Sequence, residues 1–267
     1  MSVLASIAEF SLLAFGLLLL AVQLGAHVLG YRLGRRRSEH AQPENVGVVV
    51  GGMIALLAFV LALTLSFASA RYSERRAGTL AEANAIGTAW LRAEALGGKR
   101  GEQIARLLEQ YTKVREDFAR TGRVRERISE LNQQTNALQS TIWGHMAAII
   151  REQPGPVSVS LMTALNDTFD TGMTERFAIE SGLPSQIFWL LIILTLVSTV
   201  SLGYQLGIKG KAQPVLVLLL CAMWTLVMVN ILDLASARLG NFRTDTSPYD
   251  WTLRGFKGGV TIPQLPG

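Results

Sequence analysis

Four long stretches of the chain contain no Asp, Glu, Lys or Arg, and this pattern limits the fold more than any other feature. The stretches cover residues 10–31, 45–70, 181–208 and 212–232. A bilayer core about 30 Å thick is crossed by roughly 20 apolar residues in a helix. The pattern excludes an ordinary soluble domain, a disordered chain, a collagen-like chain and a disulfide scaffold. The sequence therefore predicts an all-α, polytopic membrane protein with four transmembrane helices.

The loop within each pair of predicted transmembrane helices is short, so the helices form two antiparallel hairpins. Between the hairpins, apolar residues recur at spacings of three and four, which is typical of helices that pack by one face. This predicts a helical domain inserted between the second and third transmembrane helices, with the second helix continuing past Arg71. The predicted parts are a hairpin over 1–70 (helices about 7–29 and 46–70), the inserted domain over 71–186, a hairpin over 187–235 (helices about 187–206 and 215–235) and a C-terminal tail over 236–267.

The net charge of +5 comes mainly from basic residues at the predicted membrane edges, because residues 71–186 hold 15 basic and 14 acidic side chains. Lipid phosphates attract basic residues at membrane edges. We therefore expect a lipid bilayer as a partner and not nucleic acid. The positive-inside rule places the two short loops in the cytoplasm, whereas three arginines after the second helix oppose this orientation. The edge residues are Arg32, Arg35, Arg36, Arg37, Lys209 and Lys211.

Signatures of enzymes and metal sites are absent from the sequence. It has no Gly-rich phosphate loop ending in Lys-Ser/Thr and no HExxH. The three histidines, His27, His40 and His145, are scattered, whereas a zinc site needs three or four converging ligands. The one cysteine, Cys221, lies within an apolar run and is interpreted as a buried hydrophobe. We expect no catalytic activity, no metal and no cofactor.

An apolar stripe on the second predicted transmembrane helix suggests a pore. Phe59, Leu63 and Phe67 are spaced by four, so they project from nearly one face. Copies of this helix around a symmetry axis would form an apolar constriction, and such constrictions can gate by dewetting. The alternative is that the three side chains face lipid or pack against other helices.

The residues after this helix carry a dense pattern of charged and polar side chains. It is interpreted either as an ion-paired stalk that leaves the membrane or as a charged vestibule whose arginines concentrate anions. In the stalk interpretation, Asn84, Gly87, Thr88 and Leu91 form a small-residue packing face. The residues that carry this pattern are Arg71, Arg75, Arg76, Glu82 and Asn84.

Two polar residues lie near the end of the fourth predicted helix. Asp233 follows a charge-free run, and Asn230 precedes it by about one turn. A carboxylate at membrane depth normally faces a bundle interior or water, which would make it functional. The alternative is that Asp233 lies at the interface and pairs with Arg238 or another flanking arginine.

The sequence resembles the bacterial bestrophin-like membrane proteins over roughly residues 10–245. The resemblance is carried by LAFVLA at 57–62, RYxxRR at 71–76, EANAIGTA at 82–89, ALND at 164–167 with Arg176, and LDL at 232–234 before Gly240. It implies four transmembrane helices and a helical domain after the second. More distantly, bestrophins are pentameric channels, chiefly for anions, with an apolar neck of three residues spaced by four on the second helix. On that basis the neck role is carried over to Phe59, Leu63 and Phe67.

Two features depart from the bestrophin pattern. Animal bestrophins have an acidic calcium clasp after the last helix, whereas Asp245 and Asp250 are isolated in this sequence, so calcium gating is not expected. Bestrophins also place the large domain and both termini in the cytosol, which is the reverse of the orientation that the loop charges favour.

Two functions follow as expectations. The first is a homo-oligomeric ion channel in a bacterial inner membrane, pentameric by the resemblance and conducting inorganic anions. The second is a membrane-anchored helical interaction or sensing protein that transports nothing.

Overall fold

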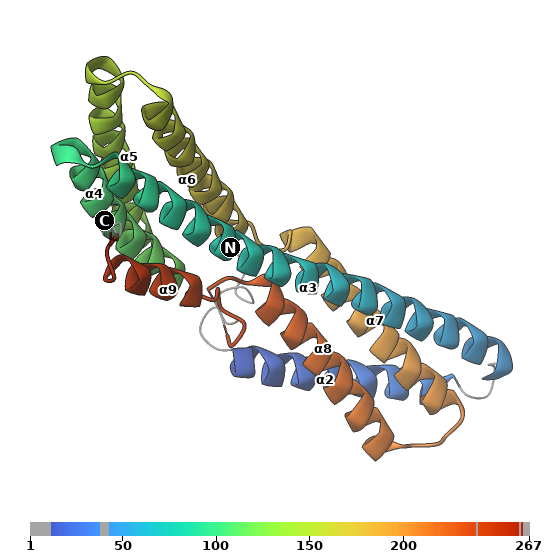
Figure 1. Cartoon of the computed structure of the whole chain (residues 1–267). Coiled ribbons are helices and arrows are strands. Elements are labelled where there is room, and N and C mark those ends of the chain that lie inside the picture. Colours follow the sequence, from blue (N-terminus) through green and yellow to red (C-terminus); the bar gives the residue numbers. More distant parts are fainter. Residues whose placement is uncertain (1–11, 38–42, 239, 262, 264–267) are drawn as a thin grey trace. The chain divides into compact units, whose positions relative to one another are not determined.

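A computed structural model describes residues 12–37, 43–238, 240–261 and 263 of the 267-residue chain (Figure 1). All regular secondary structure in these residues is α-helical, which confirms the predicted fold class. The helices are α2 (Leu12–Arg36), α3 (Pro43–Leu96), α4 (Gly98–Arg120), α5 (Arg125–Glu152), α6 (Pro156–Glu180), α7 (Ser185–Ile208), α8 (Pro214–Ala235) and α9 (Ser247–Phe256).

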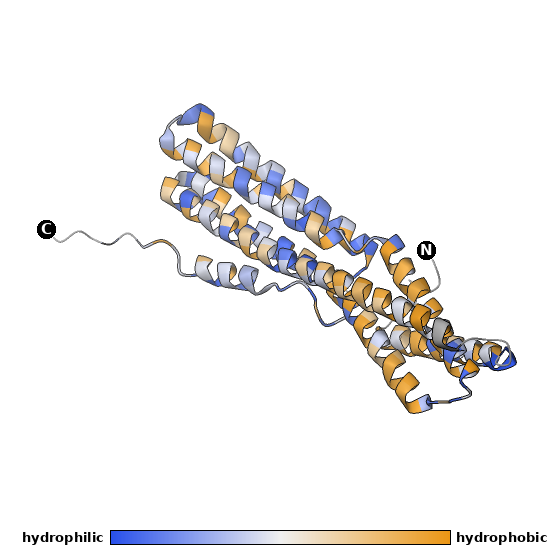
Figure 2. Cartoon of the chain, turned by 90° about the vertical axis from the view of Figure 1, so that its right-hand side faces the viewer, coloured by the Kyte–Doolittle hydropathy of each residue, from blue (hydrophilic) through white to orange (hydrophobic). Residues whose placement is uncertain are grey.

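Four helical stretches among the described residues are long and apolar enough to cross a membrane: α2, the part of α3 from Val46, the stretch Pro156–Ile208 that includes α7, and α8. Four transmembrane helices are therefore confirmed as the architecture. Residues 7–11 of the first predicted helix lie outside the described residues. The apolar residues gather on one group of helices and the polar residues on another (Figure 2).

The helices extend beyond the predicted membrane segments. α2 runs on to Arg36, past the predicted end near residue 29, and its last turn contains Arg35 and Arg36. Basic side chains interact favourably with the last carbonyls of a helix, so a charged end can remain helical outside the apolar core. The second predicted helix continues past Arg71 as expected and ends only at Leu96.

The chain divides into two compact units. The membrane unit contains residues 1–71 and 182–242, and the helical unit contains residues 72–181 and 243–267. α3 belongs to both units. The sequence predicts a C-terminal tail over 236–267. The structure instead places residues 243–267, which include α9, in the helical unit.

In the membrane unit, α2 and α7 run parallel and touch through glycine. A Cβ added at Gly30 would overlap the carbonyl oxygen of Val200, and one added at Gly203 would overlap the carbonyl oxygen of His27. Gly34 and Gly207 make the same close approach one turn further along. Small residues spaced by four allow helix backbones to meet in lipid, where packing replaces the hydrophobic effect. These four glycines therefore set the α2–α7 distance.

Three glycines near the start of α3 make no such backbone contact. Gly51 and Gly52 have no neighbouring atom within 4 Å of an added Cβ, and Gly47 approaches only the side chain of Gln205. The bundle is also joined by a buried hydrogen bond of 2.9 Å, which Gln23 on α2 donates to Thr225 on α8.

In the helical unit, the predicted apolar faces are buried. Ile104, Leu108, Tyr111 and Phe118 line the inner face of α4. On α5, Leu131, Ile142 and Met146 do the same. On α6 the apolar residues are spaced strictly by four and therefore drift around the helix. Leu161 and Leu165 are buried, whereas Met173 and Phe177 are exposed.

Candidate functional site

The apolar stripe on α3 lies on the open side of the membrane unit. Phe59, Leu63 and Phe67 are 61%, 55% and 44% exposed in the single chain. Leu57 and Leu61 point to the other side of the helix and are buried in the core formed with α2, α7 and α8. The structure therefore places the three predicted neck residues together on one face that no other described part of the membrane unit covers.

The three arginines that follow the stripe have different surroundings. The guanidinium of Arg71 lies 5.6 Å from the centre of the Phe67 ring, a cation–π contact at the end of the stripe. Arg76 is exposed and lies 3.8 Å from the carboxylate of Asp245. Arg75 is buried, with its guanidinium 5.8 Å from the centre of the Tyr72 ring. Arg75 therefore faces the interior of the helical unit and not an open vestibule of the single chain.

Glu82 is the centre of a buried polar cluster in the helical unit. Its Oε1 accepts a hydrogen bond of 2.6 Å from Nε of Arg115, and its Oε2 accepts one of 3.0 Å from a terminal nitrogen of the same guanidinium. The hydroxyl of Tyr249 donates a third bond of 2.5 Å to Oε2. This fork-to-fork pairing of guanidinium and carboxylate is the strongest common side-chain hydrogen-bond arrangement. Glu82 thereby joins α3 to α4 and α9.

Arg115 extends the same cluster to α6. It donates a bond of 2.9 Å to the carbonyl oxygen of Gly172. A glycine is required at this position, because an added Cβ would lie 2.6 Å from the Tyr111 hydroxyl and 3.0 Å from Glu82 Oε1. Burial and then the Glu82 charge raise the pKa of both Tyr111 and Tyr249, so both hydroxyls stay protonated.

A second carboxylate, Glu175 on α6, is buried in the same cluster. Its Oε1 accepts a bond of 2.6 Å from the hydroxyl of Thr79 on α3. Burial raises the pKa of Glu175 to about 7, with the Glu82 charge adding to the rise and the Thr79 bond and the two arginine charges opposing it. The cluster thus contains a carboxyl group that changes its charge near neutral pH, next to one that is firmly paired.

Asn84, which the sequence placed on a packing face, is exposed, as are Thr88 and Leu91. The packed face of this part of α3 is instead formed by Ala83, Ile86, Ala89, Trp90 and Ala93. The prediction that these residues form a packing face is therefore wrong for the single chain. They are exposed along the outer side of α3.

Asp233 closes a turn after α8. Its carboxylate is buried and accepts hydrogen bonds of 3.0 and 3.1 Å from the backbone N–H groups of Asn241 and Phe242. Gly240 has a φ of 61°, and an added Cβ there would overlap the Asp233 carboxylate. Asn230 donates its amide back to the carbonyl oxygen of Leu226 on its own helix. We interpret these hydrogen bonds of Asp233 and Asn230 to the backbone as structural and not as part of a functional site.

The two acidic residues after α8 are paired with arginines and lie in the helical unit. Asp245 lies beside Arg76, and Asp250 accepts a bond of 2.9 Å from Arg120. Among the described residues, no group of three or more His, Cys, Asp or Glu side chains could hold a metal ion.

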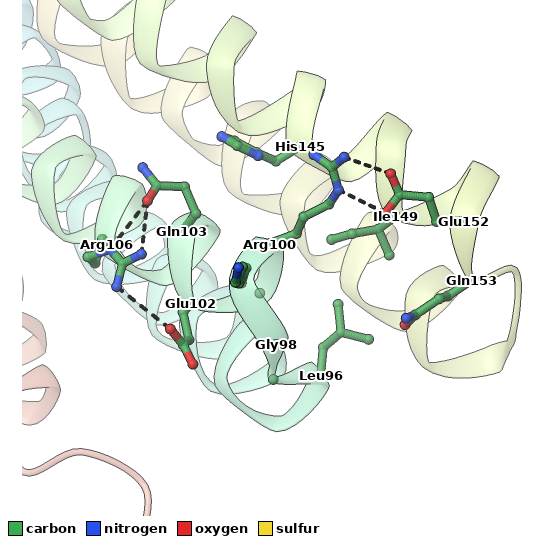
Figure 3. Close-up of a pocket in the computed structure, with 13 residues that line it drawn as sticks. Leu96, Gly98, Arg100, Glu102, Gln103, Arg106, His145, Ile149, Glu152 and Gln153 are labelled. Atoms are coloured by element: carbon green, nitrogen blue, oxygen red, sulfur yellow. Dashed lines mark hydrogen bonds and ion pairs between the residues drawn. The ribbon is translucent and has the colours of Figure 1, made fainter.

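A groove of about 840 Å³ lies between the start of α4 and the end of α5 in the helical unit (Figure 3). Its wall carries a two-bond ion pair between Arg100 and Glu152, with distances of 2.9 and 2.6 Å. Arg106 is held in turn by Gln103 and Glu102. Since these charged groups neutralise one another, the groove offers less net charge than its residues suggest.

Sequence reasoning missed several members of the buried cluster. Arg115 and Tyr249 lie 33 and 167 positions from Glu82, so no local motif connects them. Glu175 has no distinguishing sequence signal, because α6 also contains Asp167, Asp170 and Glu180.

The comparisons identify one family. Residues 17–249, most of the chain, match the family model described as the Bestrophin-like domain. No curated protein and no solved structure matches the chain significantly.

Proposed function

Because the chain belongs to the Bestrophin-like family, we propose that it forms a homo-oligomeric, anion-conducting channel without enzymatic activity. Several copies of α3 would surround one axis, with Phe59, Leu63 and Phe67 as an apolar neck. An apolar constriction narrow enough to exclude water blocks ions, and it conducts when it widens and becomes wet.

The observation that carries this proposal is the exposure of the three neck residues on one face of α3. A long apolar face that is open in the single chain contacts either lipid or another protomer. On the same side of the helix, the exposed residues from Ala70 onward are mostly small, with Glu74 as the charged exception: Ala70, Ser73, Ala77, Ala81, Asn84 and Thr88. Small side chains allow neighbouring helices to approach closely, which supports α3 packing against copies of itself.

Anions are the favoured ions because of the charges next to the stripe. Arg71 lies against Phe67 at the end of the stripe, whereas the exposed Arg76 is on the opposite side of α3 and beside Asp245. Positive side chains at a constriction raise the local concentration of anions. The contribution of Arg76 is reduced by Asp245, so Arg71 is the residue that we propose to dominate the field.

The test is chloride flux from proteoliposomes that contain the full chain. We expect Leu63→Ala to increase flux, because a smaller side chain weakens an apolar constriction. Leu226→Ala is the matched control, since Leu226 is 63% exposed on α8 and away from the stripe. Flux that is absent in the wild type and in both variants, from correctly folded protein, would contradict the proposal.

A second candidate function is supported by a different surface. Met173 and Phe177 are 63% and 67% exposed on α6 of the helical unit. They are spaced by one helical turn, and we propose that they belong to a protein-binding surface, as expected for a membrane-anchored interaction protein. If Phe177→Ser abolishes capture of a partner while chloride flux is absent from the wild type, the interaction function replaces the channel.

A further inference from the structure

The two short loops and the two parallel helices of the membrane unit bring basic side chains together at one end. Gly207 of α7 packs on the backbone of Tyr31 and Arg35 of α2, so both helices finish at the same level. Arg35 also reaches the loop after α7, where its Nη1 would lie 3.0 Å from a Cβ on Gly210. Six exposed cations result: Arg32, Arg35, Arg36, Arg37, Lys209 and Lys211.

Few acidic residues oppose this basic end. In the whole sequence from 12 to 70 and from 182 to 232, the only acidic residues are Glu39 and Glu44. The one carboxylate that the structure describes in the membrane unit, Asp233, is at the far end of α8 and is bonded to backbone N–H groups. The basic end therefore carries a surplus of positive charge even when both glutamates are counted.

An apolar groove of about 430 Å³ opens between the start of α3 and the end of α7. Val46, Val49 and Met53 form one wall, and Val200, Ser201 and Tyr204 form the other. Tyr204 precedes Lys209 by five residues, which is about 7.5 Å along a helix. The groove thus runs from the apolar core toward the basic end.

The combination matches the two parts of a phospholipid. A hydrocarbon chain packs favourably in an apolar groove at membrane depth. A phosphate headgroup is attracted to lysine and arginine at the interface. Tyrosine is favoured at this boundary, because its ring is apolar and its hydroxyl is polar. A free phosphate ion would use the cations but would leave the groove without a role.

We propose that the α3–α7 groove and the basic end of α2 and α7 form a binding site for one anionic phospholipid. The acyl chain occupies the groove, and the headgroup is held by the cations of the basic end. The site is independent of the proposed conduction, because it uses neither the neck residues nor the helical unit.

Native mass spectrometry of the full chain tests this, with equal amounts of phosphatidylglycerol and phosphatidylcholine added in detergent. We expect retained phosphatidylglycerol to exceed phosphatidylcholine in the wild type. In the variant R36Q/K209Q/K211Q, the affinity for phosphatidylglycerol should fall by about fivefold for each removed cation that contacts the headgroup. The control K99Q/R254Q/K257Q removes the same charge from exposed residues of the helical unit and should keep the preference.

The groove is tested separately from the charges. Val49→Trp fills it, and Val48→Trp adds the same bulk to a neighbouring residue that is 78% exposed and does not line it. We expect only Val49→Trp to lower lipid retention, with Ser201→Phe as a second filling variant if the first does not fold. Equal retention of both lipids by the wild type, retention unchanged by both filling variants, or full displacement by inorganic phosphate would each overturn the proposal.

Discussion

The Nε atom of Arg115 donates a hydrogen bond of 2.6 Å to Oε1 of Glu82, and both side chains are buried. Their elements, α4 and α3, are joined by this pair at the centre of the helical unit. The desolvation of two buried charges is costly, so such a pair is stabilising only while both partners are present. The pair therefore makes the packing of the helical unit depend on a single carboxylate.

Removing that carboxylate charge should destabilise the helical unit severely. Glu82→Gln leaves the buried Arg115 guanidinium without the carboxylate that is hydrogen-bonded to it, and we expect a loss of about 3–5 kcal/mol in the free energy of unfolding. The measurement is denaturant unfolding of the purified protein, followed by circular dichroism. Glu152→Gln is the control, because its ion pair with Arg100 is exposed and surface pairs contribute little. A loss for Glu82→Gln as small as that of the control would contradict the role of the pair.

Glu175 should make the stability of the helical unit depend on pH. Its pKa is raised from an ordinary value of 4.5 to about 7 in the folded state, chiefly by burial. The folded protein therefore binds this proton more tightly than the unfolded chain does. The resulting stability is complete below pH 4.5, declines between pH 4.5 and 7, and is lost above pH 7, with a span of roughly 3 kcal/mol.

The variant Glu175→Gln isolates this effect, because its amide is neutral at every pH and can still accept the Thr79 bond. We expect the variant to gain stability relative to the wild type as pH rises from 5 to 8. Other titrating groups cancel in this difference, including Glu116, whose pKa is also raised by burial. A stability difference that is constant across this range would show that Glu175 does not titrate there.

The glycines between α2 and α7 allow a sharp test of membrane packing. Gly30→Ala would force a methyl group into the carbonyl of Val200, whereas Gly25→Ala on the same helix meets no atom within 4 Å. We therefore expect Gly30→Ala to lower the melting temperature in detergent. Gly25→Ala should preserve or raise it, because alanine favours a helix over glycine. Equal melting temperatures would mean that α2 and α7 separate easily.

The sequence predicted the spans well because charge is excluded from the bilayer core, and each span is a continuous run. It predicted the faces of α4 and α5 because their apolar residues keep the helical period. It could not predict that Glu82 meets Arg115 and Tyr249, since side-chain partners in distant segments leave no periodic signal. The close glycines were accessible in principle, because Gly30 with Gly34 and Gly203 with Gly207 are both spaced by four.

Asn84 is exposed and Arg75 is buried, and the pattern along α3 alone did not predict either. Both faces of that stretch contain small residues, so composition alone did not distinguish them. The face that packs was decided by α4, α6 and α9, which contribute the partners of Glu82 and Thr79.

The central claim is that Leu63 lines the conduction path of an oligomer, which fills with water when the neck opens. The most direct measurement is chloride flux from proteoliposomes of Leu63→Cys in a Cys221→Ala background, before and after a charged, membrane-impermeant thiol reagent. We expect the reagent to change flux through Leu63→Cys and to leave flux through Leu226→Cys unaffected. Flux that does not respond to the reagent at Leu63→Cys, or that responds equally at both positions, would contradict it.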